Sequence, residues 1–298
     1  MDDAHRVALN RQYQRLLGWT PADLGGTTND QTLLAPIRGV QEAAGVTVDG
    51  VCGPATYEAV LRQQRTALKV PQAPGDRLVN AGRLALVEAK LLWLGKVIDP
   101  PDRSSQYAAS RQVIDDLIRS SDGIGWDWEA PYRQNGDFEW CGTLAAWGWR
   151  SAGLTLPLRK LYFPSTYRLD RYARYASVNG EPPSAKPATG RRKLLELDES
   201  SGPEAALYAA DDPPRAGDIL LVGPEKSGYG KHICLVESYD LERGLFATIE
   251  GNGTGAWPSG GRVHGIVRNL RPVGLGRDDP PTRYHPRRLI RPSVSDLA

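Results

Sequence analysis

The chain has 298 residues, and its 37 lysines and arginines against 35 aspartates and glutamates leave a formal net charge of only +2. A charge so close to neutral lacks the basic footprint of a nucleic-acid-binding protein. No apolar run is long enough to span a bilayer, so we expect no membrane insertion. The length predicts two domains, and residues 69–78, which include two prolines and a glycine, are the expected linker.

The first domain, residues 1–68, is predicted to be a small all-α three-helix bundle. Helices are expected over residues 7–17 and 37–46, and a third begins at Gly53-Pro54, because proline is favoured in the first helical turn. Asp49-Gly50 is a turn signal between the second and third helices. The pattern is typical of a compact helical module.

Cys141 is the candidate nucleophile of the second domain. The residues that follow it favour a short helix, and Asn135-Gly136-Asp137 breaks regular structure before it. At the start of a helix, the unpaired N–H groups and the positive end of the dipole favour a thiolate over a thiol. The ordinary alternative for a free cysteine is a buried hydrophobic residue.

His232 and a polar partner are predicted to lie on a β-hairpin. Strands are expected over residues 217–222, 232–239, 245–250 and 262–269. A turn centred on residue 241 pairs His232 with Glu250, whereas a turn centred on 242 pairs His232 with Asn252. Either pairing places an orienting group beside the imidazole, as in a catalytic triad. The helix that begins at Cys141 is expected to pack on the sheet face that carries His232.

Four motifs in this order resemble the CHAP family, the cysteine, histidine-dependent amidohydrolases/peptidases that cut peptidoglycan. They are Trp140-Cys141 with its small apolar helix, Pro214 to Asp218 before an apolar strand, Lys231-His232-Ile233, and Thr248 to Asn252. The resemblance covers residues 79–275 and implies an α+β, papain-like domain in which a nucleophile helix packs on an antiparallel sheet. Residues 155–213, longer and more polar than usual, form a variable insert.

The resemblance also implies the roles of individual residues. Cys141 is the expected nucleophile, His232 the base, Glu250 the third member and Asn252 a fourth polar group. The implied reaction is cleavage of a peptidoglycan amide through a cysteine acyl-enzyme, as an N-acetylmuramoyl-L-alanine amidase or as a stem or cross-link endopeptidase. No cofactor is implied, and no set of His, Cys, Asp and Glu has the sequence spacing of a metal site.

The amino-terminal module resembles the three-helix peptidoglycan-binding domain that accompanies wall hydrolases, with residues 23–33 as a decayed copy of its Asp-Gly turn. Peptidoglycan is therefore the expected partner, although a fold by itself does not establish binding. Two alternatives stay open. One is a catalytically silent wall-binding protein, and the other is an amidase that acts on a non-wall amide such as a glutathionyl-polyamine.

The first six residues do not read as a signal peptide. The protein is therefore expected to reach the bacterial cell wall or periplasm by lysis, through secretion or injection machinery, or with a leader that has been removed. A phage lysin fits the first route, and an antibacterial effector with an immunity protein as partner fits the second.

The remaining segments are expected to be structural. Cys52 and Cys234 are predicted to be buried spectators without a disulfide. Residues 276–298 are predicted to form a basic, proline-rich, solvated tail.

Overall fold

The computed structural model describes residues 34–70, 76–92, 141–154, 193–196, 213–224, 231–240, 243–256, 262–272 and 284–292, with residues 10, 166, 169 and 297. The chain divides into two compact units, the first made mainly of Met1–Pro71 and the second of most of the remaining residues. Among the helices that the structure describes, none combines the length and apolarity that a membrane span requires.

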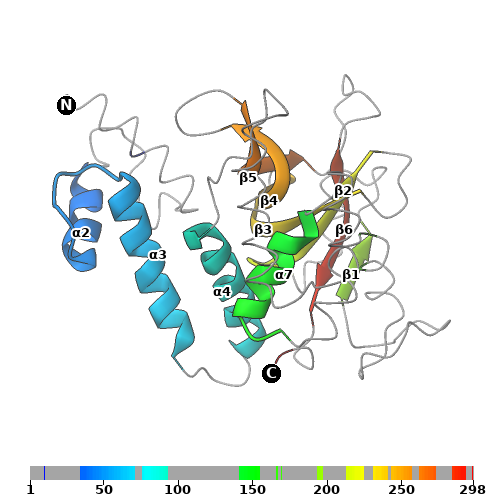
Figure 1. Cartoon of the computed structure of the whole chain (residues 1–298), viewed down its shortest axis with the longest axis horizontal. Helices are drawn as coiled ribbons and strands as arrows, with labels where there is room; N and C mark the ends of the chain where they lie inside the picture. Colours follow the sequence, from blue (N-terminus) through cyan, green and yellow to red (C-terminus); the bar gives the residue numbers. More distant parts are fainter. Residues whose placement is uncertain are drawn as a thin grey trace, which may run out of the picture. The chain divides into compact units, whose positions relative to one another are not determined.

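The first unit contains two packed helices. Helix α2 spans Leu34–Ala44 and helix α3 spans Pro54–Lys69 (Figure 1). Ile37 on α2 is buried, as are Val60 and Leu61 on α3, so the apolar faces of both helices are covered. Helix α3 begins at the predicted proline. The expected helix over residues 7–17 lies outside the described residues except for one helical position, residue 10, and residues 23–33 lie outside them altogether.

Two buried amides hold the loop between α2 and α3. The side chain of Gln41 donates to Asp49 Oδ1 at 2.8 Å and accepts from the backbone N–H of Gly50 at 2.9 Å. Asn10 donates to the carbonyl of Gly50 at 2.7 Å and accepts from the N–H of Cys52 at 2.5 Å. The predicted turn at residues 49–50 is confirmed, with Gly50 at φ 75°.

The second unit is a mixed α+β structure with helices α4 (Arg77–Leu92) and α7 (Cys141–Ser151). Its sheet has the strand order β1-β6-β2-β3-β4-β5, and every neighbouring pair is antiparallel (Figure 1). The strands are β1 Lys193–Glu196, β2 Ile219–Gly223, β3 His232–Asp240, β4 Leu245–Ala256, β5 Arg262–Pro272 and β6 His285–Arg291. The four predicted strands are thus confirmed, although β4 and β5 run further than expected.

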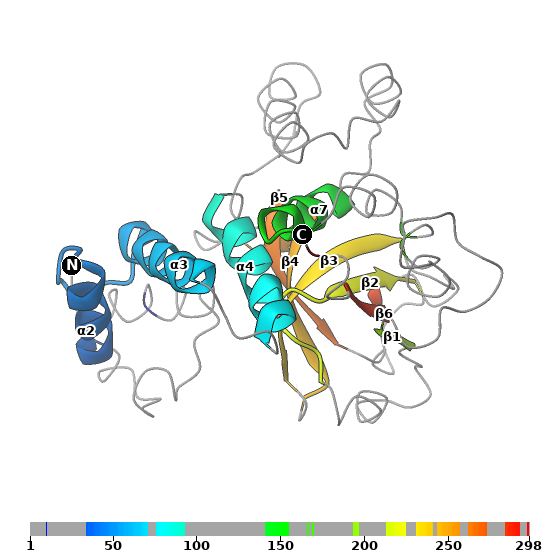
Figure 2. The same cartoon turned by 90° about the horizontal axis from the view of Figure 1, so that it is seen from below.

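The two faces of the sheet bury different sets of side chains. Helices α4 and α7 lie side by side (Figure 2), and Ile233, Leu235 and Ile249 belong to the same buried cluster as residues of both helices. The neighbouring strand positions alternate to the opposite face, where Val236 and Phe246 belong to a second cluster. The helix-covered face therefore carries the larger core.

A close backbone approach fixes α4 against the turn that precedes β2. Gly217 has φ 88°, and a Cβ at this position would lie 2.2 Å from the carbonyl oxygen of Gly82 on α4. A Cβ on Gly82 would in turn lie 2.5 Å from the carbonyl oxygen of Ala216. The indole N–H of Trp149 donates to the carbonyl of Gly217 at 2.8 Å. Only glycine fits both positions, and α7 is tied to the same turn.

The prediction of a solvated tail over residues 276–298 is wrong for residues 285–291. These residues form β6, which lies between β1 and β2, with Leu289 and Ile290 buried. Arg291 is also buried, and its guanidinium donates to both carboxylate oxygens of Asp218 at 2.7 Å. The basic composition of this segment led to the prediction of a tail. The internal strand could not be predicted from it, because Asp218, which neutralises Arg291, lies 73 positions earlier in the chain. The α+β unit therefore extends beyond residue 275.

We predict that Gly217→Ala destabilises the second unit more than Gly153→Ala does. Both glycines have positive φ, but no atom lies within 4 Å of a Cβ built on Gly153. Gly153→Ala should lower the free energy of unfolding by about 1–2 kcal/mol, the penalty of a left-handed conformation. Gly217→Ala adds overpacking worth about 1–3 kcal/mol. Urea unfolding measures the difference, and equal losses would contradict the close approach.

Candidate active site

Cys141 is the first residue of α7, as the sequence predicts. Its side chain is buried in the core that α7 shares with the sheet. The backbone N–H groups of the first helical turn have no acceptor inside the helix, so they are available to an anion. The segment before Cys141 lies outside the described residues.

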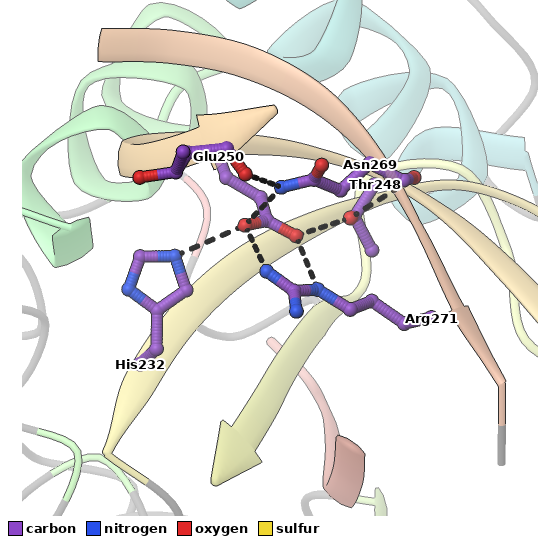
Figure 3. Close-up of polar contacts among 6 residues, drawn as sticks. His232, Thr248, Glu250, Asn269 and Arg271 are labelled. Carbon is purple, nitrogen blue, oxygen red and sulfur yellow. Dashed lines mark hydrogen bonds and ion pairs between the residues drawn. The ribbon is translucent and has the colours of Figure 1, made fainter. Parts of the chain in front are cut away.

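His232 is the first residue of β3 and interacts with both other members of a candidate catalytic triad, Glu250 and Cys141. Its Nε2 lies 3.2 Å from Oε2 of Glu250, and Nδ1 lies on the other side of the ring, away from that carboxylate (Figure 3). A hydrogen bond with Cys141 is among the interactions that raise the pKa of His232. The structure therefore brings Cys141, His232 and Glu250 together, the arrangement expected of a nucleophile, a base and an orienting group.

The observed register of β3 and β4 excludes one of the two predicted hairpin turns, those centred on residue 241 and on residue 242. The residue opposite Glu250 is Cys234, so the turn centred on residue 241, which pairs His232 directly with Glu250, is wrong. The hydrogen bond between His232 and Glu250 is instead diagonal, within reach because a glutamate side chain is long.

Asn252 lies where the ladder is interrupted. The pairing of β4 with β5 shifts between Glu250 and Gly253, and Asn252 has φ 56°, a conformation that asparagine tolerates better than most residues. It is half-buried at this bulge. Its role as a fourth polar group of the site stays a prediction.

The expectation that α7 packs on the face carrying His232 is also wrong. A Cβ built on Gly148 of α7 would lie 3.4 Å from the side chain of Leu235, and Ile233 and Leu235 both lie in the cluster that α7 shares with the sheet. Strand alternation then places His232 on the opposite face with Cys234. Cys141 and His232 still interact, because Cys141 is the first residue of α7 and His232 is the first residue of β3. At the end of a strand, a side chain can reach past the edge of the sheet toward a group on the other face.

Glu250 is the most heavily hydrogen-bonded group of the site (Figure 3). Thr248 Oγ1 donates to Oε1 at 2.6 Å, and Asn269 Nδ2 donates to Oε2 at 2.9 Å. Arg271 donates from Nε to Oε1 at 2.8 Å and from Nη2 to Oε2 at 2.6 Å. Sequence reasoning missed these three residues. Asn269 ended the strand predicted over residues 262–269, and the spacing of two between Asn269 and Arg271 was the available signal once that strand is extended to Pro272.

The charges of the site are mutually dependent. Burial alone raises the pKa of Glu250, but hydrogen bonds from His232 and Arg271 and the charges of both residues lower that pKa well below its usual range. Burial likewise lowers the pKa of His232, but Cys234, Cys141 and Glu250 together raise it well above its usual range. The arrangement favours a buried carboxylate beside an imidazolium.

Cys234 borders the site and does not carry its charge. Its thiol is fully buried opposite Glu250, and burial raises its pKa to about 12. A thiol with that pKa is neutral near pH 7, so Cys234 acts on His232 there through their hydrogen bond, and the full negative charge beside the imidazolium is that of Glu250. The three cysteines, at positions 52, 141 and 234, are all free and buried.

One group of described residues has the atom types of a metal site. The ligand atoms of His232, Cys234 and Glu250 lie within 4.8 Å of one another, although their sequence spacing gave no such indication. The oxygens of Glu250 already accept one hydrogen bond each from His232, Thr248 and Asn269 and two from Arg271. The guanidinium also places a positive charge beside the space that a cation requires. The group fits an acid–base pair better than a metal centre.

Comparisons of the chain with protein-family models, with curated proteins and with solved structures found no match.

We predict that Glu250→Gln lowers the free energy of unfolding of the second unit by about 3–5 kcal/mol at pH 7, the usual loss when a buried ion pair loses one partner. The folded-state pKa of Glu250 lies below the unfolded value of about 4.3, so its stabilisation is complete above that pH. It is lost as the pH falls through the folded value, and the gap to the wild-type protein narrows there.

Denaturant unfolding followed by tryptophan fluorescence measures this gap. Seven of the eight tryptophans follow residue 72, so the signal reports mainly on the second unit. Asp240→Asn is the matched control, because the Asp240–Arg243 pair is exposed and is worth about 0–1 kcal/mol. A gap for Glu250→Gln that stays constant down to the lowest pH would contradict the assignment of a buried carboxylate.

Proposed function

We propose that the protein is a thiol-dependent peptidoglycan hydrolase of the CHAP type, which cleaves an amide bond of the bacterial cell wall. One observation carries the proposal: a cysteine at the start of a helix interacts with a histidine that is hydrogen-bonded to a buried carboxylate. The packing of α7 on β3 and β4 of an antiparallel sheet supports a papain-like arrangement.

The mechanism follows from the positions of these groups. Nδ1 of His232 takes the proton of Cys141, and the thiolate attacks the carbonyl carbon of the amide. The imidazolium then protonates the leaving amine, which gives a thioester on Cys141. A water molecule, deprotonated by His232, attacks the thioester and releases the acid. Throughout, Glu250 holds Nε2 and stabilises the imidazolium.

The start of α7 also offers a hydrogen-bond donor to the oxyanion of the tetrahedral intermediate. The negative charge on the substrate oxygen develops next to the nucleophile, where the backbone N–H of Cys141 lies at the positive end of the helix. The short helix thus has two roles, because it positions the nucleophile and stabilises the tetrahedral intermediate.

The first unit supports the wall as the substrate. Its two described helices and the tight turn at Gly50 agree with the three-helix peptidoglycan-binding resemblance of the sequence. We propose that it holds the protein on peptidoglycan, at the wall or in the periplasm, after lysis, export or injection. Hydrolysis of a non-wall amide such as a glutathionyl-polyamine is the second candidate, since the same triad chemistry serves any accessible amide.

We predict that the wild-type protein clears a suspension of peptidoglycan sacculi and that Cys141→Ala does not, with a loss of rate of at least about a thousandfold because the nucleophile is removed. Cys52→Ala is the matched control, since Cys52 is a buried thiol of the first unit. Mass spectrometry of the released fragments identifies the bond that is cut. Equal clearing by wild type and Cys141→Ala would overturn the proposal.

We also predict that Cys141→Ala still sediments with sacculi and that adding Gln41→Ala weakens this binding several-fold. The Gln41 amide holds the loop between α2 and α3, so its loss leaves buried partners unsatisfied in the first unit. Co-sedimentation measures the bound fraction. Unchanged binding of the double variant, with an unfolded first unit shown by circular dichroism, would assign wall binding to the second unit.

A further inference from the structure

The carboxylate of Glu250 is wholly removed from solvent, with a side chain that is 0% exposed, and yet it is ionised. A buried carboxylate is stable as an anion only where neighbouring cations and hydrogen bonds replace its hydration. Two cationic groups contact it. His232 contacts one oxygen, and Arg271 contacts both.

Arg271 reaches Glu250 along the sheet. The ladder partner of Glu250 on β5 is Val267, and Arg271 lies four residues further along that strand, opposite Phe246. Its Nε and Nη2 each bind a different oxygen of the carboxylate. A two-point contact of this kind fixes the plane of the carboxylate as well as its charge, which a single ammonium group cannot do. The fork thus directs Oε2 toward His232.

The geometry points to Arg271 as a positioning residue of the proposed hydrolase, which keeps Glu250 ionised and oriented toward His232 in acid so that Cys141 remains reactive there. This inference rests on the proposed roles of Cys141 and His232. It extends the site by one residue that never touches the substrate and acts through Glu250.

The other groups near the site do not replace Arg271 in this role. Among the described residues, the titratable or charged groups that face Glu250 are His232 and Cys234 on β3 and Arg271 on β5, and Cys141 of α7 faces His232. Cys234 is neutral below pH 8 because burial raises its pKa to about 12. Without Arg271, burial favours protonation of Glu250 in acid, and the imidazolium of His232 loses the counter-charge through which it supports Cys141.

Arg268 offers a matched control on the same strand. Its side chain is 18% exposed, against 19% for Arg271, and it binds the buried carboxylate of Glu237, which also binds Lys90 of α4. Along β5, Arg268 alternates with Val267 and Asn269, so its ion pair lies on the other face of the sheet from Glu250. Loss of Arg268 removes a comparable ion pair without touching Glu250.

The test is the rate at which iodoacetamide alkylates Cys141 as a function of pH, measured by peptide mass spectrometry on the full chain. We expect Arg271→Met to move the acid limb of the profile up by about one pH unit, a tenfold slower alkylation at a fixed pH on that limb. Arg271→Lys, which retains the charge without the fork, should lie between Arg271→Met and wild type. Arg268→Met should keep the wild-type limb even where it lowers the melting temperature.

Three results would overturn the inference. The acid limb of the alkylation profile of Arg271→Met could lie at the same pH as in wild type, it could move to lower pH, or the acid limb of Arg268→Met could move by the same amount as that of Arg271→Met. Infrared difference spectra against pH give a second measurement. They should show a protonated carboxylic acid in Arg271→Met at mildly acidic pH, absent from wild type and from Arg271→Met combined with Glu250→Gln. Neither readout needs a wall substrate, so failure to clear sacculi leaves this test intact.

Discussion

The second unit is organised around one constraint: the carboxylate of Glu250 is ionised where no water reaches it. Three strands contribute to its stability. β3 supplies His232, β4 supplies Thr248, and β5 supplies Asn269 and Arg271. Each contact requires the observed strand register. A shift of one strand by one residue would leave the buried carboxylate of Glu250 without its charged partners. The ion pairs thus specify the strand pairing as well as the site.

Two other buried carboxylates of the second unit are paired with cations, one on the helix-covered face of the sheet and one next to the start of β2. Glu237 binds Lys90 and Arg268 on the helix side, and Asp218 binds Arg291 next to the turn that carries Gly217. These groups join elements distant in sequence, and they bind charged groups and the backbone. We interpret them as structural, because paired charges of this kind fix the relative position of α4, β2, β3, β5 and β6.

Local patterns predicted the elements nearest to the site. Alternating apolar residues and the Asp240–Gly244 turn located β3 and β4, and the residues after Cys141 located α7. The register could not be predicted in full because bulges near Glu237 and Asn252 change the pairing without a clear sequence signal. Arg271 was missed because its contact spans a diagonal of the sheet.

The position of β6 has a consequence for biosynthesis. The strand lies between β1 and β2 and yet follows every other described strand in sequence, so the place between β1 and β2 stays open until residue 291 has left the ribosome. The β2 edge that β6 covers, with Leu220 beside Leu289, is exposed during that interval. With this topology the sheet cannot be completed before β6 is synthesised, and translation products truncated before β6 should expose an unpaired, apolar strand edge to chaperones and proteases.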